Sequence, residues 1–290
     1  MALFCLSLFE EKTKPPTKEA RQREQVKKTL KKKDSGVQVV KRDERREQER
    51  KRERDKPRDA VIPDTDKILR VAILIDDIGQ DLGALRELLE INAPLSFAVL
   101  PLQPHSAEAA KRIHLKNRDI LLHLPMEPKS YPEDRPGNGA LFLSMTDKEI
   151  RTQFQSNLET VPHAKGVNNH MGSRFTEDTE KMLVVMTELK EKGLFFVDSR
   201  TTKDSKAKEA ANKIGVPFLA RRIFIDNDRN YQVSLENLTR WLENPGMQGS
   251  SPVLFIGHPY PSTILAIRDA ISSIRAKGIE IVPISKIVPQ

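Results

Sequence analysis

The sequence predicts an α/β fold, a (β/α) barrel with about seven strands, over residues 68–290. One observation is the repeated alternation of short apolar runs with amphipathic segments, which is typical of parallel strands joined by helices. A second is the length of this region, which suffices for one large hydrophobic core. A third is that no glycine-rich phosphate-binding loop follows the first apolar run, which argues against a dinucleotide-binding sheet.

The first half of this region begins with a wholly apolar run, 71–75, as expected for a buried strand. The elements expected after it are, in order, a helix over 82–91, a strand over 95–100, a helix over 105–117 and a strand over 120–124. A loop rich in Pro and Gly then occupies 125–144. Thr146 and Glu149 have the spacing of a capping box, which predicts a helix over 146–161.

The second half repeats the alternation up to the last residues of the chain. The elements expected there are, in order, a strand over 165–168, a helix capped by Thr176 and ended by Gly193, a strand over 194–197, a helix over 205–214, a strand within 218–225, a helix over 235–242, a strand over 253–256, a helix over 264–274 and a strand over 279–282. In the first of these helices, Met182, Met186 and Leu189 recur at helical spacing and form one apolar face.

Charge divides the chain into two parts. Residues 1–70 contain 22 Lys and Arg against 14 Asp and Glu, so the whole net charge of +8 lies there. Residues 10–67 are a low-complexity mixture of charged residues without apolar periodicity, so we expect residues 1–67 to be a disordered basic tether ahead of a domain over 68–290. Mixed charges without interleaved aromatic residues favour a solvated tether over an arm that binds nucleic acid, and no nucleic acid partner is expected.

The apolar start over residues 1–9 is open to two interpretations. It is either the tail of an export signal or anchor, which would allow peripheral membrane contact, or an irregular N-terminus. No run in the sequence approaches the roughly 18 apolar residues that span a bilayer. Cys5 is the only cysteine, which excludes an intrachain disulfide.

Acidic and histidine residues follow the expected strands. These residues are Asp76, Asp77, His123, Asn168, Asn169, His170, Asp198, Asp226 and His258. Because the carboxyl ends of parallel strands lie on one face of such a fold, we expect these side chains to meet there. Each residue alone has an ordinary structural explanation, such as a helix cap, but their joint placement favours a functional site.

The residue types point to metal-assisted hydrolysis of an amide or ester. Histidine nitrogens and carboxylate oxygens are ligands of divalent ions such as Zn²⁺. Of two adjacent aspartates, one can bind the metal while the other takes a proton from the attacking water. A histidine on the opposite side can then protonate the leaving group.

Five motifs make this region resemble the divergent polysaccharide deacetylase family. The motifs are Ile75–Gly79, His123–Pro128, Asn168–Phe175, Val197–Thr202 and Gly257–Pro261. The resemblance covers 70–288 and implies a distorted (β/α) barrel like that of the polysaccharide deacetylases, export to the periplasm or cell envelope, and a carbohydrate polymer as substrate. The catalytic residues that it implies are Asp76 as general base, His258 as general acid, Asp198 as the carboxylate that orients His258, and Arg174 as the arginine that holds the base.

The metal ligands implied by the resemblance include Asp77 and His123. Typical members place a second histidine four residues after the first, where this chain has Glu127. Either Glu127 or His170 could supply the third ligand. We favour His170, because Pro125 disfavours a helical approach of Glu127 to His123. The expected cofactor is therefore a divalent metal, with Zn²⁺ favoured, held by Asp77, His123 and His170.

Two functions from different classes fit this sequence. The leading hypothesis is a metal-dependent deacetylase that removes acyl groups from an envelope glycan. The alternative is a catalytically silent carbohydrate-binding or envelope-assembly protein that keeps the same barrel. Asp76 and His258 favour the enzyme, because ionisable groups in a cleft are costly unless they are paired or used.

Overall fold

The computed structural model describes residue 23, residues 69–243 and residues 252–289. The chain divides into two compact units, Met1–Pro63 and Asp64–Gln290. The expected tether over 1–67 and the apolar start lie, except for Arg23, outside the described residues, and both stay predictions. No helix in the described ranges is long and apolar enough to cross a membrane.

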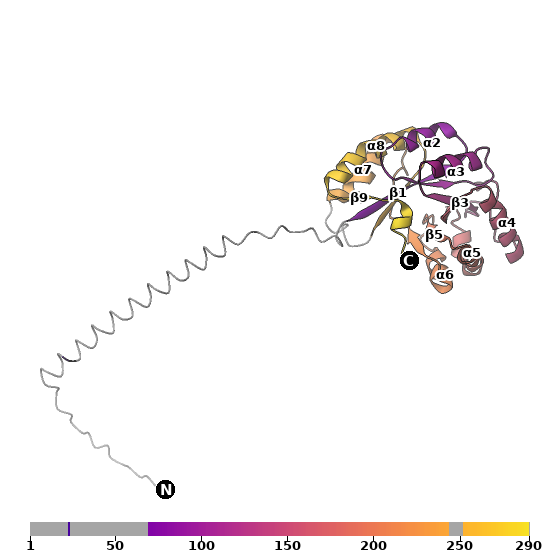
Figure 1. The fold of residues 1–290 in the computed structure, drawn as a ribbon. Helices are drawn as coiled ribbons and strands as arrows, with labels where there is room; N and C mark the ends of the chain where they lie inside the picture. Colours follow the sequence, from indigo (N-terminus) through magenta and orange to yellow (C-terminus); the bar gives the residue numbers. More distant parts are fainter. Residues whose placement is uncertain (1–22, 24–68, 244–251, 290) are drawn as a thin grey trace, which may run out of the picture. The chain divides into compact units, whose positions relative to one another are not determined.

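One parallel sheet organises the unit over 64–290 (Figure 1). Its strands follow the order β6-β5-β4-β3-β2-β1-β8-β7, and β9 pairs with β1. The strands are β1 (Arg70–Ile78), β2 (Ser96–Val99), β3 (Ile120–Met126), β4 (Gly166–Met171), β5 (Phe195–Asp198), β6 (Phe218–Ala220), β7 (Ile223–Phe224), β8 (Val253–Gly257) and β9 (Glu280–Ile281). The predicted distorted (β/α) barrel is confirmed, with eight strands along the path instead of about seven.

Helices connect the strands and cover the outside of the sheet (Figure 1). They are α2 (Leu82–Leu89), α3 (Ser106–Leu115), α4 (Asp147–Glu159), α5 (Thr179–Glu191), α6 (Ala207–Ile214), α7 (Tyr231–Thr239) and α8 (Pro261–Ala276). The predicted capping box starts α4: the Thr146 side chain accepts from the Glu149 backbone, and the Glu149 carboxylate accepts from the Thr146 backbone.

The predicted cap of α5 is wrong. Asp178 is the N-cap, and its carboxylate accepts a hydrogen bond of 2.9 Å from the Lys181 backbone. Thr176 lies instead in a short 3₁₀ turn, where its hydroxyl donates to the carbonyl of Gly172. The helix therefore begins three residues after the expected cap.

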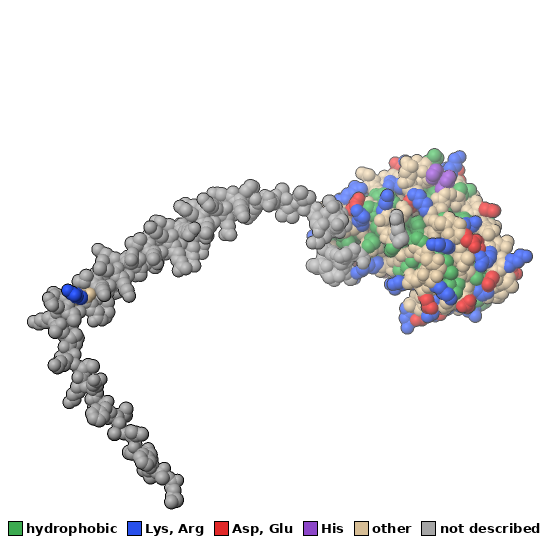
Figure 2. All heavy atoms as spheres, turned by 60° about the horizontal axis from the view of Figure 1, so that its bottom comes forward, with side chains coloured by type: hydrophobic (Ala, Val, Ile, Leu, Met, Phe, Trp, Pro, Cys, Tyr) green, Lys and Arg blue, Asp and Glu red, His purple; other side chains and the backbone are tan. Residues whose placement is uncertain are grey.

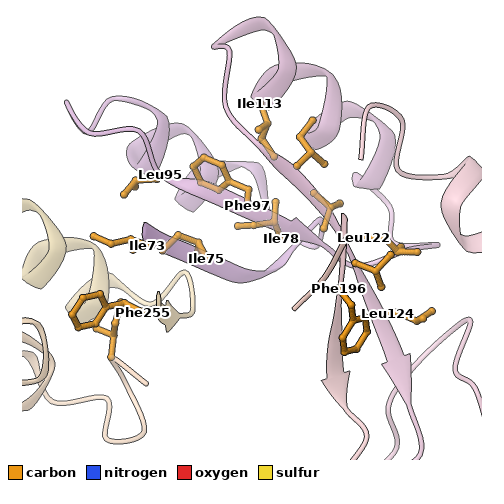
Figure 3. Packing of buried hydrophobic residues seen from close by; sticks show 14 of the residues in the cluster. Ile73, Ile75, Ile78, Leu95, Phe97, Ile113, Leu122, Leu124, Phe196 and Phe255 are labelled. Carbon is orange, nitrogen blue, oxygen red and sulfur yellow. The ribbon is translucent and has the colours of Figure 1, made fainter. Parts of the chain in front are cut away.

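Strand side chains alternate between two apolar layers. The outer layer, between sheet and helices, includes Ile73, Ile75 and Phe97 (Figure 3). The inner layer consists of residues from strands and from the C-terminal segment 282–288, and no member comes from α2 to α8. Its buried members are Ala72, Leu74, Ala98, Leu121, Phe195, Val197, Leu254, Ile256, Val282, Ile284 and Ile287. Because strand side chains alternate, these two layers show which way the residues at each strand end point.

The expected strand within 218–225 is two short strands at opposite edges of the sheet. β6 pairs with β5, whereas β7 pairs with β8. Between them, the backbone amide of Arg221 donates to Asp198 at 2.9 Å and that of Arg222 donates to Leu254 at 3.0 Å. This crossing joins the two edges of the sheet and completes the distorted barrel.

Candidate active site

A bulge in β1 turns both Asp76 and Asp77 towards the same site. Ile75 pairs with Phe97 and Ile78 with Val99, so β1 holds one more residue than β2 between these pairs. Asp77 has a φ of 59°, a left-handed conformation that is uncommon for a residue other than glycine. In a regular strand, adjacent side chains would point to opposite faces. The extra residue removes that constraint, and both carboxylates lie within 4 Å of the His123 ring.

Three atoms with lone pairs meet at the ends of β1, β3 and β4. Oδ1 of Asp77 lies 3.1 Å from Nε2 of His123 and 3.0 Å from Nδ1 of His170. The two ring nitrogens are themselves 3.1 Å apart. The strands produce this geometry because His123 pairs in register with Asn168, and His170 is two residues further along the same face of β4. These three residues form the metal-type cluster found in the described part of the chain.

The cluster fits a divalent cation. Oδ1 of Asp77 is buried but has no hydrogen-bond partner of acceptable geometry, despite the two nearby nitrogens. Lone pairs this close repel one another unless a positive charge lies between them. Ligand atoms about 2.0 Å from a tetrahedral Zn²⁺ are about 3.3 Å apart, which is close to the spacing of these three atoms. The two imidazoles and one carboxylate are also a ligand set that suits zinc.

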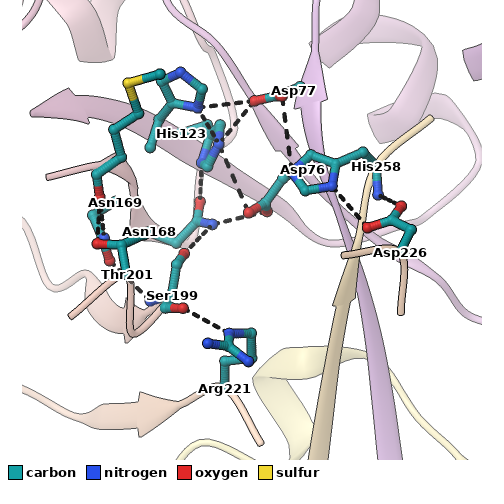
Figure 4. A network of polar contacts seen from close by, with 12 residues as sticks. Asp76, Asp77, His123, Asn168, Asn169, Ser199, Thr201, Arg221, Asp226 and His258 are labelled. Atoms are coloured by element: carbon teal, nitrogen blue, oxygen red, sulfur yellow. Dashed lines mark hydrogen bonds and ion pairs between the residues drawn. The ribbon is translucent and has the colours of Figure 1, made fainter. Parts of the chain in front are cut away.

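Asn168 fixes the orientation of the His123 ring (Figure 4). Its Nδ2 donates to Oδ1 of Asp76 at 2.8 Å, so its own Oδ1 faces Nδ1 of His123 at 3.0 Å. Because an amide oxygen only accepts, His123 carries a proton on Nδ1 and directs Nε2 towards Asp77. This is the tautomer that can bind a metal through Nε2. The sequence predicts no role for Asn168, because its register with His123 follows from strand pairing and is not visible in the sequence.

The carboxylate that orients His258 is Asp226, so the prediction of Asp198 for this role is wrong (Figure 4). Nδ1 of His258 contacts Oδ1 of Asp226 at 2.9 Å. The other Asp226 oxygen accepts from the His258 backbone at 2.6 Å and from the Thr263 hydroxyl at 2.8 Å. These contacts hold Asp226 in place and leave Nε2 of His258 facing Asp77 at 3.9 Å.

Side-chain alternation explains why Asp198 is elsewhere. Val197 belongs to the inner layer, so Asp198, the next residue, points outward. Phe224 also packs on the inner layer, so Asp226, two residues later, points inward. Asp198 instead accepts a hydrogen bond of 2.7 Å from the backbone of Arg200.

Arg174 does not hold the base, contrary to the prediction. Its Nη1 donates to Oε1 of Glu127 at 2.8 Å, and Oε2 of Glu127 accepts from the Leu143 backbone at 2.7 Å. Both oxygens of Glu127 are therefore engaged away from the cluster formed by Asp77 and the two histidines. Arg221 is an arginine whose charge acts on Asp76, and the sequence analysis did not identify it.

Four site groups have shifted pKa values. Burial lowers the pKa of His123, but the nearby Asp76 and Asp77 raise it above its ordinary value. Burial raises the pKa of Asp76, against the lowering effect of His123 and His258. Burial would also raise the pKa of Asp77, but the adjacent His123 and His170 rings bring it below its ordinary range. For His258, burial lowers the pKa, but the hydrogen bond to Asp226 and the charge of Asp76 together raise it to about 9. At neutral pH the site therefore combines an ionised Asp77 with a protonated His258.

Fold and cluster together define a (β/α)-barrel protein with a candidate metal site at its strand ends. The model of the divergent polysaccharide deacetylase family matches residues 73–288, and the chain belongs to this family.

Curated relatives share this region. The chain is 34% identical over 203 residues to the uncharacterized protein YibQ of Escherichia coli K12, a match that covers 70% of this chain and 62% of that protein. It is also 34% identical over 199 residues to an uncharacterized protein of Haemophilus influenzae, covering 69% of this chain and 70% of the relative. The chain thus spans less than two thirds of the length of the first relative.

A solved structure has the same fold. The crystal structure of an uncharacterized protein from Agrobacterium tumefaciens C58 superposes with a TM-score of 0.71 at 22% identity, and the match covers 77% of this chain and 90% of that one. This similarity supports the barrel architecture.

Proposed function

We propose that this protein is a metal-dependent carbohydrate deacetylase that removes acyl groups from a glycan of the cell envelope. The observation that carries the proposal is the buried Oδ1 of Asp77, which lacks a hydrogen bond and lies between two imidazole nitrogens. Membership of the divergent polysaccharide deacetylase family supports a carbohydrate substrate. The envelope location rests on the family resemblance alone, and fractionation of cells into periplasm, membrane and cytoplasm tests it.

Asp77, His123 and His170 would hold the cation, for which the ligand set favours Zn²⁺. When bound, such a cation supplies Lewis acidity, which polarises the acyl carbonyl and makes water more acidic. Asn168 keeps the His123 ring in the tautomer that this role requires. Because Asp77 has a lowered pKa, its carboxylate stays ionised at neutral pH.

Asp76 acts as the general base that takes a proton from the attacking water. Its Oδ1 is held by Asn168 at 2.8 Å, while its Oδ2 lies 3.7 Å from Nε2 of His123, on the side of the cluster. Burial raises the pKa of Asp76, which makes this carboxylate a stronger base than an exposed aspartate. Oδ2 is therefore the atom that receives the proton.

His258 acts as the general acid that protonates the leaving nitrogen or oxygen. Its Nδ1 is fixed by Asp226, and its Nε2 faces the cluster, 3.9 Å from Oδ2 of Asp77. Asp226 raises the pKa of His258, to about 9 without a bound cation, and this favours a protonated ring that can give its proton to the leaving group. Asp226 stabilises the imidazolium without itself exchanging the proton.

Release of acetate from acetylated chitooligosaccharides and acetylated peptidoglycan tests the proposal. We expect the full chain to release acetate, to lose this activity in EDTA and to regain it with Zn²⁺. Asp76→Asn and His258→Ala should each reduce turnover by about 10²–10⁴ while leaving the metal content intact. If metal-loaded protein releases no acetate from any of these glycans, the proposed deacetylase activity is refuted and the alternative of a carbohydrate-binding protein is favoured.

A further inference from the structure

A cavity of about 900 Å³ lies between the end of β5, the segment 200–205, α6 and β6. The proposed mechanism does not use it. Its volume falls within the range of about 300–1,000 Å³ that is typical of ligand pockets in proteins. Asp77, His123 and His170 do not line the cavity. Asp198 does, and it lies at a strand end on the same side of the barrel.

The lining of this cavity is basic. It includes Arg200, Lys203 and Lys208, and within the described ranges none of these three side chains forms an ion pair. The surrounding segment 198–222 contains seven Lys and Arg against three Asp and Glu, although residues 71–290 contain 27 of each kind. On the face shown in Figure 2, basic and acidic side chains are intermixed. Basic residues are thus in excess in the segment beside the cavity.

Asp198 is the only acidic residue among the described residues of the lining. It is 4% exposed, and burial raises its pKa, against the lowering effect of the hydrogen bond from Arg200. Its Oδ1 also accepts a hydrogen bond from the Arg200 backbone. The cavity therefore remains attractive to anions despite this carboxylate.

The backbone at Ser199 and Arg200, beside the cavity, is held by the Arg221 side chain. Arg200 has a φ of 50°, and the side chain of Arg221 donates to the carbonyl of Ser199 at 2.7 Å and to that of Arg200 at 3.1 Å. Arg221 in turn stacks over the Phe224 ring at 3.7 Å. Pre-organisation of this kind lowers the entropic cost of binding a ligand.

Hydrogen bonds also link this backbone segment to the candidate active site (Figure 4). Ser199, the neighbour of Arg200, accepts a hydrogen bond of 3.3 Å from Asn168, which itself donates to Asp76. The Ser199 backbone also donates to Asn169 at 2.9 Å. Only two hydrogen-bonded side chains, Asn168 and Ser199, therefore separate Asp76 from the segment that carries Arg200, a spacing that one glycan chain can cover.

We propose that this cavity binds an anionic group, a carboxylate or a phosphate, carried by the same glycan chain that presents its acyl group to the site. Guanidinium and ammonium groups bind both anions through charge-assisted hydrogen bonds. The proposal rests on the proposed function for the position of the glycan, but it concerns a separate set of residues. It narrows the substrate class to acidic glycans.

Equilibrium binding of three oligosaccharides to the full chain tests this proposal. The probes are hexagalacturonate with carboxylates, phosphorylated maltohexaose with phosphates, and neutral chitohexaose. We expect at least one charged probe to bind in a salt-sensitive manner. The double variant Arg200→Gln/Lys208→Gln should bind it about tenfold or more weakly, because each lost contact involves a charged group.

Lys213→Gln is the matched control, because Lys213 lies on α6 but outside the lining. It should bind the charged probe within about twofold of the unchanged chain. An equal loss in this control would show diffuse surface attraction and overturn the proposal. Failure of both charged probes to bind the unchanged chain would overturn it as well.

Lysine labelling read by mass spectrometry locates the bound probe. It distinguishes binding in the cavity from binding to the basic N-terminal residues. The bound anion should slow the labelling of Lys203 and Lys208 but not of Lys213, and the probe that protects identifies carboxylate or phosphate as the source. Uniform slowing at all three lysines would contradict the proposal. Anion binding without acetate release would refute the proposed enzyme only, whereas acetate release without anion binding would refute the cavity only.

Discussion

Removal of the Asp226 charge should lower the pKa of His258. Asp226 lies 2.9 Å from Nδ1, and its hydrogen bond is the largest of the effects that raise this pKa to about 9, compared with 6.5 for an ordinary histidine. In Asp226→Asn we therefore expect the pKa to fall by about one pH unit or more, equivalent to about 1.4 kcal/mol.

The raised pKa also makes stability depend on pH. Because the folded-state pKa of His258 lies above 6.5, its stabilising contribution is fully present below about pH 6.5 and is lost as the pH rises through about 9. In Asp226→Asn the loss should occur at a lower pH. Urea denaturation at pH 6 and pH 9 should show a smaller difference in unfolding free energy for the variant.

Histidine-labelled NMR titration measures the pKa itself, with His258→Ala to assign the signal. The protein is treated with EDTA, because a bound cation would also lower the pKa of His258. Asp198→Asn is the control, since Asp198 contacts Arg200 and points away from the barrel interior. The reasoning is refuted if Asp226→Asn leaves the His258 pKa unchanged and Asp198→Asn lowers it.

Four further substitutions, of which Glu127→Gln is a control, probe other contacts of the site and the packing beside it. Asp77→Ala should abolish metal binding, measured as bound metal per chain by elemental analysis. Glu127→Gln should leave the bound metal per chain unchanged, because both Glu127 oxygens bind other groups. The opposite pattern would make Glu127 the ligand. Asn168→Ala should weaken metal affinity by about 10–100-fold, measured by competition with a chelator, because His123 loses the partner that sets its tautomer; unchanged affinity would refute this role. Gly257→Ala should cost about 1–3 kcal/mol of stability, because the added Cβ would lie 3.0 Å from Ile225 and 3.1 Å from Thr263; an unchanged Tm would contradict this packing.

Signals local in the sequence predicted much of this structure. The capping box of Thr146 and Glu149 starts α4 as expected, and the apolar run at 71–75 lies within β1. The placement of polar residues after strands also predicted that Asp77, His123 and His170 meet, because parallel strands end on one face. These features depend on the spacing of residues along the chain, which can be read from the sequence.

Features that depend on register could not be predicted in the same way. The identity of the carboxylate beside His258 depends on which residues of 218–225 form strands. The sequence predicted one strand there instead of two, so the inward direction of Phe224 and Asp226 could not be derived. The bulge at Asp76 and Asp77 arises from pairing with β2, which no local pattern records. Similarly, α7 begins at Tyr231, because Asn230 caps it, four residues before the expected start.

An anomalous difference map from crystals of the full chain grown with Zn²⁺ tests the central claim most directly. The account predicts one strong peak about 2.0–2.2 Å from Oδ1 of Asp77, Nε2 of His123 and Nδ1 of His170. The position of Asp76 and His258 beside that peak, outside its ligands, would agree with their proposed roles. No peak in this cluster, or a peak bound by Glu127 in place of His170, would contradict the account.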